Sequence, residues 1–222
     1  MELKTWEQAL PKEGVVIILG HRRMGKSGLG WRLVEQVSRK GVRKTAVAFG
    51  IPRSRRKLVP DWVRHTDDLK RIPEKSVLLI DEASLRFSAR RSMSDPNLLL
   101  VALMGLSGQK HQLIIFISHN SRLLDVETIM DSDLVVYKLP SEAHILFERR
   151  ETAAFTQEAR TKLLEKRDPR KWSYVINFHN GKRLLLPNRL PSFWTEKLST
   201  IWAGLDIMSI ARTKKKRKGG KR

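Results

Sequence analysis

Short apolar runs alternate along the chain with longer segments in which apolar residues recur every three or four positions. Continuous runs rich in β-branched residues are typical of strands that are buried on both faces of a parallel sheet. The periodic segments between them are typical of helices, which join parallel strands by right-handed crossovers. The pattern predicts strands one to five at residues 14–19, 45–49, 76–80, 113–117 and 134–137, and helices at 26–39, 97–106 and 122–130.

The segment between the second and third strands breaks this alternation. Residues 51–68 contain two prolines, and the basic residues are Arg53, Arg55, Arg56 and Lys57. We expect a surface loop with little regular structure here. The basic cluster is a candidate contact for nucleic acid, and a solvated basic loop is an equal alternative.

The chain changes character after the fifth strand. Residues 141–166 are charged and predict a helix. Asn180-Gly181 lies between two apolar runs, and this dipeptide favours a tight turn, so the segment predicts a β-hairpin. Trp194, Leu198 and Trp202 would form one face of a short closing helix. We therefore expect an α/β core at 1–150, a helical and hairpin extension at 151–211, and a disordered basic tail at 212–222.

Composition narrows the class of protein. A chain of 222 residues is long enough for one α/β domain with a small appendage. No stretch approaches the roughly 18 apolar residues of a membrane-spanning helix, and no secretory signal is evident, so a cytoplasmic location is expected. The absence of cysteine excludes disulfides, thiol catalysis and Cys-ligated zinc.

The net charge of +21 indicates a polyanionic partner. Residues 212–222 carry eight of the positive charges, so a charge of +13 remains on the body of the chain. Such a tail would neutralise the phosphates of a nucleic acid. The alternative is that the tail only improves the solubility of the protein.

Residues 20–27 match the pattern G-x-x-x-x-G-K-[ST], directly after a predicted strand and at the start of a predicted helix. In this setting backbone N–H groups surround the phosphates of a nucleoside triphosphate, Lys26 reaches the β- and γ-phosphates, and Ser27 binds Mg²⁺. The predicted ATP-binding residues are Gly20, His21, Arg22, Arg23, Met24, Gly25, Lys26, Ser27 and Gly28.

Two other strand ends carry candidate chemistry. The third strand ends at Asp81-Glu82, a Walker B arrangement in which Asp81 holds Mg²⁺ and Glu82 activates the attacking water. The fourth strand leads into Ser118, His119 and Asn120. In a sheet ordered 5-1-4-3-2 this tip faces the nucleotide, where either His119 or Asn120 could sense the γ-phosphate.

These motifs together resemble the HerA/FtsK superfamily, and within it the genome-packaging ATPases of tailless viruses with an internal membrane. The resemblance rests on GHRRMGKS, LLIDEA, KHQLIIFISHNSRLLD and SDLVVYKL, and covers residues 14–151. It implies a P-loop NTPase of the RecA/HerA-like (ASCE) type, with a mostly parallel sheet flanked by helices. The family's sensor position matches Asn120. Lys110 occupies the position of the family's trans-acting arginine finger. Other candidates for the finger are Arg86, Arg90, Arg91 and Arg122.

The resemblance implies an ATP-driven translocase that moves double-stranded DNA into a preformed capsid, as a homo-oligomeric ring that docks on capsid vertex proteins. Such a protein would act in the host cytoplasm and in the virion. The related filamentous-phage assembly proteins are usually tied to a membrane. Two alternatives remain open: another nucleic-acid-remodelling ATPase, such as a loader or phage assembly protein, and a DNA-binding assembly protein in which the nucleotide is only a switch.

Overall fold

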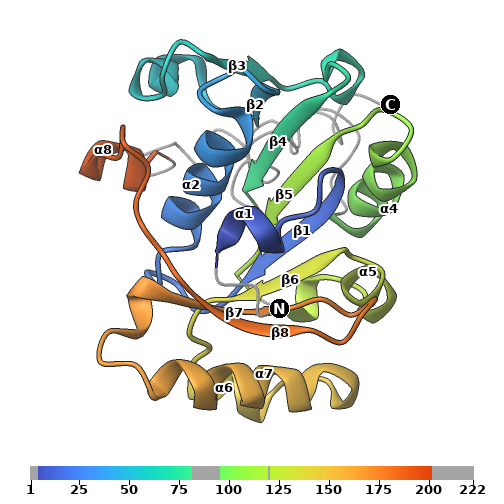
Figure 1. Ribbon diagram of the computed structural model, residues 1–222, viewed down its shortest axis with the longest axis vertical. Helices are drawn as coiled ribbons and strands as arrows, with labels where there is room; N and C mark the ends of the chain where they lie inside the picture. The colour runs from blue at the N-terminus through green and yellow to red at the C-terminus, as the bar shows by residue number, and fades with distance from the viewer. Residues whose placement is uncertain (1–4, 82–95, 120, 202–222) are drawn as a thin grey trace, which may run out of the picture.

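The computed structural model describes residues 5–81, 96–119 and 121–201, and this part of the chain forms an α/β fold around one eight-stranded sheet (Figure 1). The strand order is β3-β2-β4-β5-β1-β6-β7-β8. The strands are β1 (Gly14–Leu19), β2 (Thr45–Phe49), β3 (Val63–Thr66), β4 (Ser76–Asp81), β5 (Leu113–Ile117), β6 (Leu134–Tyr137), β7 (Trp172–Ile176) and β8 (Arg183–Pro187).

The five predicted strands correspond to β1, β2, β4, β5 and β6, and all of them pair in parallel in the predicted order 5-1-4-3-2. The complete order differs because three further strands extend the sheet at both edges. β3 adds in parallel to β2 at one edge, and β7 and β8 add antiparallel beyond β6 at the other. The α/β class and the mostly parallel sheet are therefore confirmed.

Helices cover both faces of the sheet because the central strands are apolar on both sides. One face packs against α1 (Trp6–Ala9), α2 (Lys26–Ser38) and the segment that ends with α8 (Glu196–Ser199). The other face packs against α4 (Pro96–Ser107), α5 (Val126–Met130) and α7 (Arg150–Leu164). The short α6 (Glu142–Leu146) precedes α7. In the searched part of the chain, no helix has the length and apolar character that a membrane crossing requires.

The prediction of an irregular loop at 51–68 is wrong. This segment contains the 3-10 helix η1 (Arg53–Leu58) and the strand β3, and a second 3-10 helix, η2 (Leu69–Arg71), follows. Only Val63 and Thr66 of β3 are buried, because the strand lies at the edge of the sheet, so it lacks the continuous apolar run of the central strands.

Two predicted helices are each divided. Residues 122–130 form η3 (Ser121–Leu123) and α5, and α5 begins after Asp125, whose extended backbone interrupts the helix. Residues 141–166 form α6 and α7, with a break at 147–149. In that break Glu148 accepts hydrogen bonds from the Ser121 and Thr152 hydroxyls, which ties the helix junction to the end of β5.

The predicted hairpin exists, but it continues the main sheet instead of standing apart from it. Tyr174 of β7 lies opposite Tyr137 of β6, and β8 then pairs with β7. A central strand such as β6 needs hydrogen-bonding partners on both sides, and the hairpin supplies the second one. After β8 the chain crosses to the α2 face and reaches α8, which lies beside α2 (Figure 1).

Candidate nucleotide-binding site

The loop at residues 20–25 connects the carboxyl end of β1 to the start of α2, as the motif predicts. Its backbone enters the left-handed region at Arg23 and Gly25, with φ values of 63° and 83°. Gly20 has a φ of 137°, and a Cβ there would lie 2.4 Å from the carbonyl oxygen of Lys138. Glycine at positions 20 and 25 lets the loop turn tightly around a space at the helix start.

Lys26 lies across this loop. Its Nζ donates hydrogen bonds to the carbonyl oxygens of Gly20 at 2.7 Å and His21 at 2.9 Å, and the residue is 4% exposed. The ammonium group is therefore held at the mouth of the loop, at the positive end of α2. That is a favourable place for the phosphates of a nucleotide.

Ser27 and Asp81 bring the two predicted Mg²⁺ ligands together. The Ser27 hydroxyl donates a hydrogen bond to Oδ2 of Asp81 at 3.0 Å, although the residues are 54 positions apart. Both side chains offer hard oxygen atoms of the kind that Mg²⁺ accepts, so the residues fit the ion that ATP would bring. The sheet explains the contact, because the parallel strands β1 and β4 have their carboxyl ends on the same side of the sheet, with β5 between them.

A small cavity adjoins the loop, and its lining includes Gly20, His119, His144 and Glu148. The ring of His144 contacts that of His21 edge to face, with centroids 5.7 Å apart. Burial lowers the pKa of His144, and the charges of His21 and Lys26 lower it further, while Glu148 raises it. The cavity places His119 near the loop, which supports its candidacy as a sensor.

Lys138 is a residue that the sequence analysis missed. It follows β6 directly, is fully buried, and donates hydrogen bonds from Nζ to the carbonyl oxygens of Arg170 at 2.6 Å and Trp172 at 2.5 Å. Burial lowers the pKa of Lys138 to about 7, and Asp168 acts in the opposite direction. The sequence could have indicated this residue, because Lys138 follows the strand next to β1 and therefore lies beside the loop at residues 20–25.

The carboxyl-terminal segment also reaches this site, which the sequence analysis did not predict. Gly28 lies under it, since a Cβ there would be 2.8 Å from Leu190 and 3.7 Å from Trp194. A small hollow lies between Ser27 and Asp81 on one side and this segment on the other. Its apolar lining includes Trp31, Phe49, Leu198 and Ile201.

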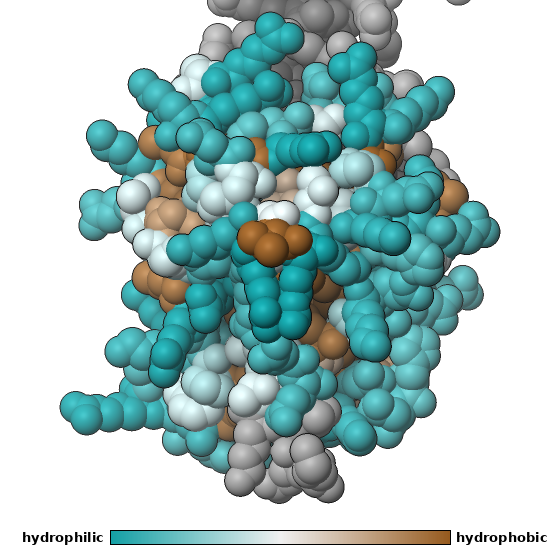
Figure 2. Space-filling view, turned by 45° about the horizontal axis from the view of Figure 1, so that its top comes forward, coloured by the Kyte–Doolittle hydropathy of each residue, from teal (hydrophilic) through white to brown (hydrophobic). Residues whose placement is uncertain are grey.

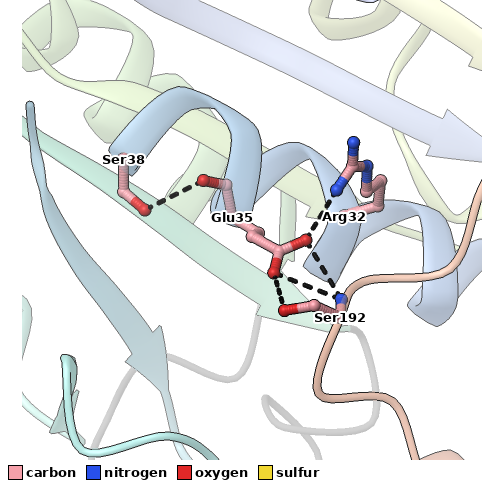
Figure 3. A network of polar contacts seen from close by, with 4 residues as sticks. All are labelled: Arg32, Glu35, Ser38 and Ser192. Atoms are coloured by element: carbon pink, nitrogen blue, oxygen red, sulfur yellow. Dashed lines mark hydrogen bonds and ion pairs between the residues drawn. The ribbon is translucent and has the colours of Figure 1, made fainter. Parts of the chain in front are cut away.

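A polar network holds the segment against α2 (Figure 3). Glu35, which is 5% exposed, accepts hydrogen bonds from the hydroxyl and the backbone N–H of Ser192 and pairs with Arg32 at 2.7 Å. Burial alone would raise the pKa of Glu35, but the hydrogen bonds of Ser192 and Arg32 together leave it below its usual value. The Phe193 ring contacts Trp31 and Trp62 edge to face.

The structure thus brings together residues 20–28 and Asp81, with His119 nearby. Lys110 lies at the amino ends of the parallel strands, on the opposite side of the sheet from the loop. It just precedes β5, and its carbonyl accepts a hydrogen bond from the Lys75 N–H. Arg122 is exposed on η3. The other predicted residues, Glu82, Arg86, Arg90, Arg91 and Asn120, lie outside the described residues.

A parallel sheet with a glycine loop between β1 and α2, and an acid from β4 beside the helix start, defines the P-loop NTPase class. No protein-family model matches the chain, and no curated protein matches it. Solved structures of the same fold do match it, and they include the genome-packaging NTPase B204 of Sulfolobus turreted icosahedral virus 2.

The B204 complexes with sulfate and with ATP-gammaS each align at a TM-score of 0.56 and 15% identity. Each alignment covers 82% of this chain, and 99% and 100% of the B204 chains, respectively. The crystal structure of B204, the DNA-packaging ATPase from Sulfolobus turreted icosahedral virus, aligns at 0.53 and 14% identity, over 80% of this chain and 98% of that one. The chain therefore has the fold of a viral packaging ATPase.

Proposed function

We propose that this protein is an ATPase that moves double-stranded DNA into a preformed viral capsid. The observation that carries the proposal is the contact between Ser27 and Asp81 beside the loop that Lys26 spans. This contact would join the two halves of a nucleotide site, in a fold similar to that of the genome-packaging NTPase B204. The strongly basic body of the chain supports DNA as the partner.

The residues of the loop would bind and orient ATP. Lys26 would exchange the carbonyl oxygens of Gly20 and His21 for the β- and γ-phosphate oxygens, which are stronger acceptors because they are charged. Ser27 and Asp81 would hold Mg²⁺, which neutralises charge on the phosphates when it is bound. Glu82, the residue after Asp81, would take a proton from the attacking water.

Completion of the site would require a second subunit. Lys110 lies at the amino-terminal edge of the sheet, away from the loop of its own subunit, so as a finger it would act on a neighbour's nucleotide. Hydrolysis would then depend on assembly of a ring. His119 or Asn120, which follow β5 in the sequence, would report the state of the γ-phosphate.

The test is the steady-state rate of ATP hydrolysis for wild type and Glu82→Gln, over a range of protein concentrations, with and without double-stranded DNA. We expect a rate per subunit that rises with concentration and DNA, and a loss of roughly a hundredfold or more in the variant. Glu127→Gln, which changes an exposed acid on α5, is the matched control and should keep the wild-type rate.

Nucleotide binding is measured in parallel for all three proteins. If the wild type binds ATP but hydrolyses none under any condition, the proposed activity is wrong. The alternative of a nucleotide-switched assembly protein then takes its place.

A further inference from the structure

A second concentration of positive charge lies far from the nucleotide loop, around a solvent-open hollow. Four arginines from three successive elements line it: Arg53 and Arg56 from η1, Arg64 from β3, and Arg71 from η2. Asp67 lines it as well, so the lining carries a net charge of +3. Figure 2, in which the top of Figure 1 is turned forward, shows hydrophilic side chains over most of the visible face.

The hollow is separate from the nucleotide site. Val47 of β2, which belongs to the core on the α4 side of the sheet, forms part of its wall, whereas α2 covers the opposite side. β3 is four strand positions from β1, a distance of roughly 19 Å at the usual strand spacing. An anion in this hollow would therefore not be the one that the loop at residues 20–27 binds.

The arginines are incompletely neutralised by the protein itself. Within the described residues, Arg53 and Arg64 make no ion pair within 4.0 Å, and both are exposed. Arg56 donates from Nε to the Ile51 carbonyl at 3.3 Å, and Arg71 pairs with Asp68 at 3.6 Å. Like charges gathered around one space repel one another, and an anion between them removes that cost.

His65 lies among these arginines. It lines the hollow, and in the described structure its buried Nδ1 atom has no hydrogen-bond partner. Burial and the neighbouring Arg56 lower the pKa of His65. A lowered pKa leaves the His65 ring neutral near pH 7, so the positive charge of the lining comes from the arginines.

From this arrangement we infer that the hollow is a second phosphate-binding site of the protein. One guanidinium group can donate hydrogen bonds to two oxygens of the same phosphate. A lining with a net charge of +3 favours an oxyanion over a neutral ligand. The phosphate belongs either to the backbone of DNA or to a free phosphate compound. The assignment of this phosphate to DNA rests on the proposed function, whereas the inference of a phosphate site does not.

The experiment compares two double variants that each remove two positive charges from exposed positions of the same region. Arg53→Gln/Arg64→Gln changes the lining, and Lys57→Gln/Lys70→Gln is the control outside it. Binding of labelled double-stranded DNA is measured by fluorescence anisotropy at several salt concentrations. We expect the arginine pair to weaken binding by about tenfold and to lower the slope of log K against log salt by about one, with much smaller changes in the control.

A second arm uses inorganic pyrophosphate and calorimetry, in a Lys26→Ala background that disables the nucleotide loop. If DNA binding is unaffected but pyrophosphate binding is lost only with the arginine pair, the site holds a free phosphate compound. If the two pairs behave alike in both arms, the inference is overturned. Neither arm needs ATP hydrolysis, so a protein that fails as an ATPase still gives a decisive result here.

Discussion

Lys138 links the nucleotide loop to the part of the chain that the sequence motifs do not cover. Its backbone carbonyl lies where a side chain at residue 20 would have to be, and its ammonium reaches the carbonyls of Arg170 and Trp172. A lysine buried in this way supports the glycine loop from the side of β6. Its charge is stabilised by backbone dipoles, which offset only part of the cost of removal from water.

This burial predicts an effect of pH on stability. The pKa of Lys138 is about 7 in the folded protein, below its value in the unfolded chain, so between these values the unfolded chain binds more protons. The free energy of unfolding should rise with pH above 7, by at most about 1.4 kcal/mol per pH unit from this group. Urea unfolding at pH 7, 8 and 9 should show a smaller rise for Lys138→Met than for wild type.

Lys182→Met, which changes an exposed lysine in the β7–β8 connection, is the control and should keep the wild-type dependence. The account of Lys138 fails if both variants and the wild type rise equally with pH.

At the scale of elements, the contact between α2 and the segment before α8 depends on Glu35 and Ser192 (Figure 3). Ser192→Ala removes a hydrogen bond to a buried carboxylate and should lower the free energy of unfolding by about 1–2 kcal/mol at pH 7. Because these hydrogen bonds depress the pKa of Glu35, their contribution is present above its ordinary value of 4.5 and is lost as pH falls through the lower folded value.

The measurement is denaturant unfolding at pH 7 and at a series of values below 4.5, with Ser199→Ala on α8 as the control. The deficit of Ser192→Ala should narrow as the pH falls, and Ser199→Ala should stay close to wild type throughout. A deficit that is the same at every pH would show that the carboxylate is not involved.

The sequence predicted the elements whose signal is local. The central strands are continuous apolar runs, and the loop between β1 and α2 has a fixed spacing of glycines, so both could be found and ordered. β3 escaped because an edge strand needs only two buried residues, Val63 and Thr66. The packing of Ser192 on Glu35 joins positions 157 residues apart, and no periodicity within either segment encodes such a contact.

At the scale of the whole molecule, the position of Lys110 predicts how subunits cooperate. A finger at the amino-terminal edge would serve the site of a neighbour, so Lys110→Ala and Glu82→Gln should each inactivate the ATPase alone. Mixed in equal amounts, they should recover about a quarter of the wild-type rate, because some interfaces then contain both native residues. The measurement is the rate of ATP hydrolysis after the two proteins are mixed.

Lys75→Ala is the control for Lys110→Ala, since Lys75 lies at the same edge and its N–H donates to the Lys110 carbonyl. It should remain active alone. Full activity of Lys110→Ala, or a mixture that stays inactive, would exclude Lys110 as the finger and leave the arginine candidates.

The indole of Trp6 donates a hydrogen bond to the carbonyl of Pro187 at 2.8 Å, across 181 positions of sequence. Pro187 is synthesised 181 residues after Trp6, so at about 5–20 residues per second it follows after roughly 10–40 seconds. Through that interval α1 has no acceptor from β8, and β6, once it is made, has only one neighbouring strand until β7 follows. The rate of translation therefore sets the earliest time at which α1 and β8 can form their contact. A chain that stops before β7 leaves the edge of β6 unpaired, and chaperones and proteases act on such exposed edges.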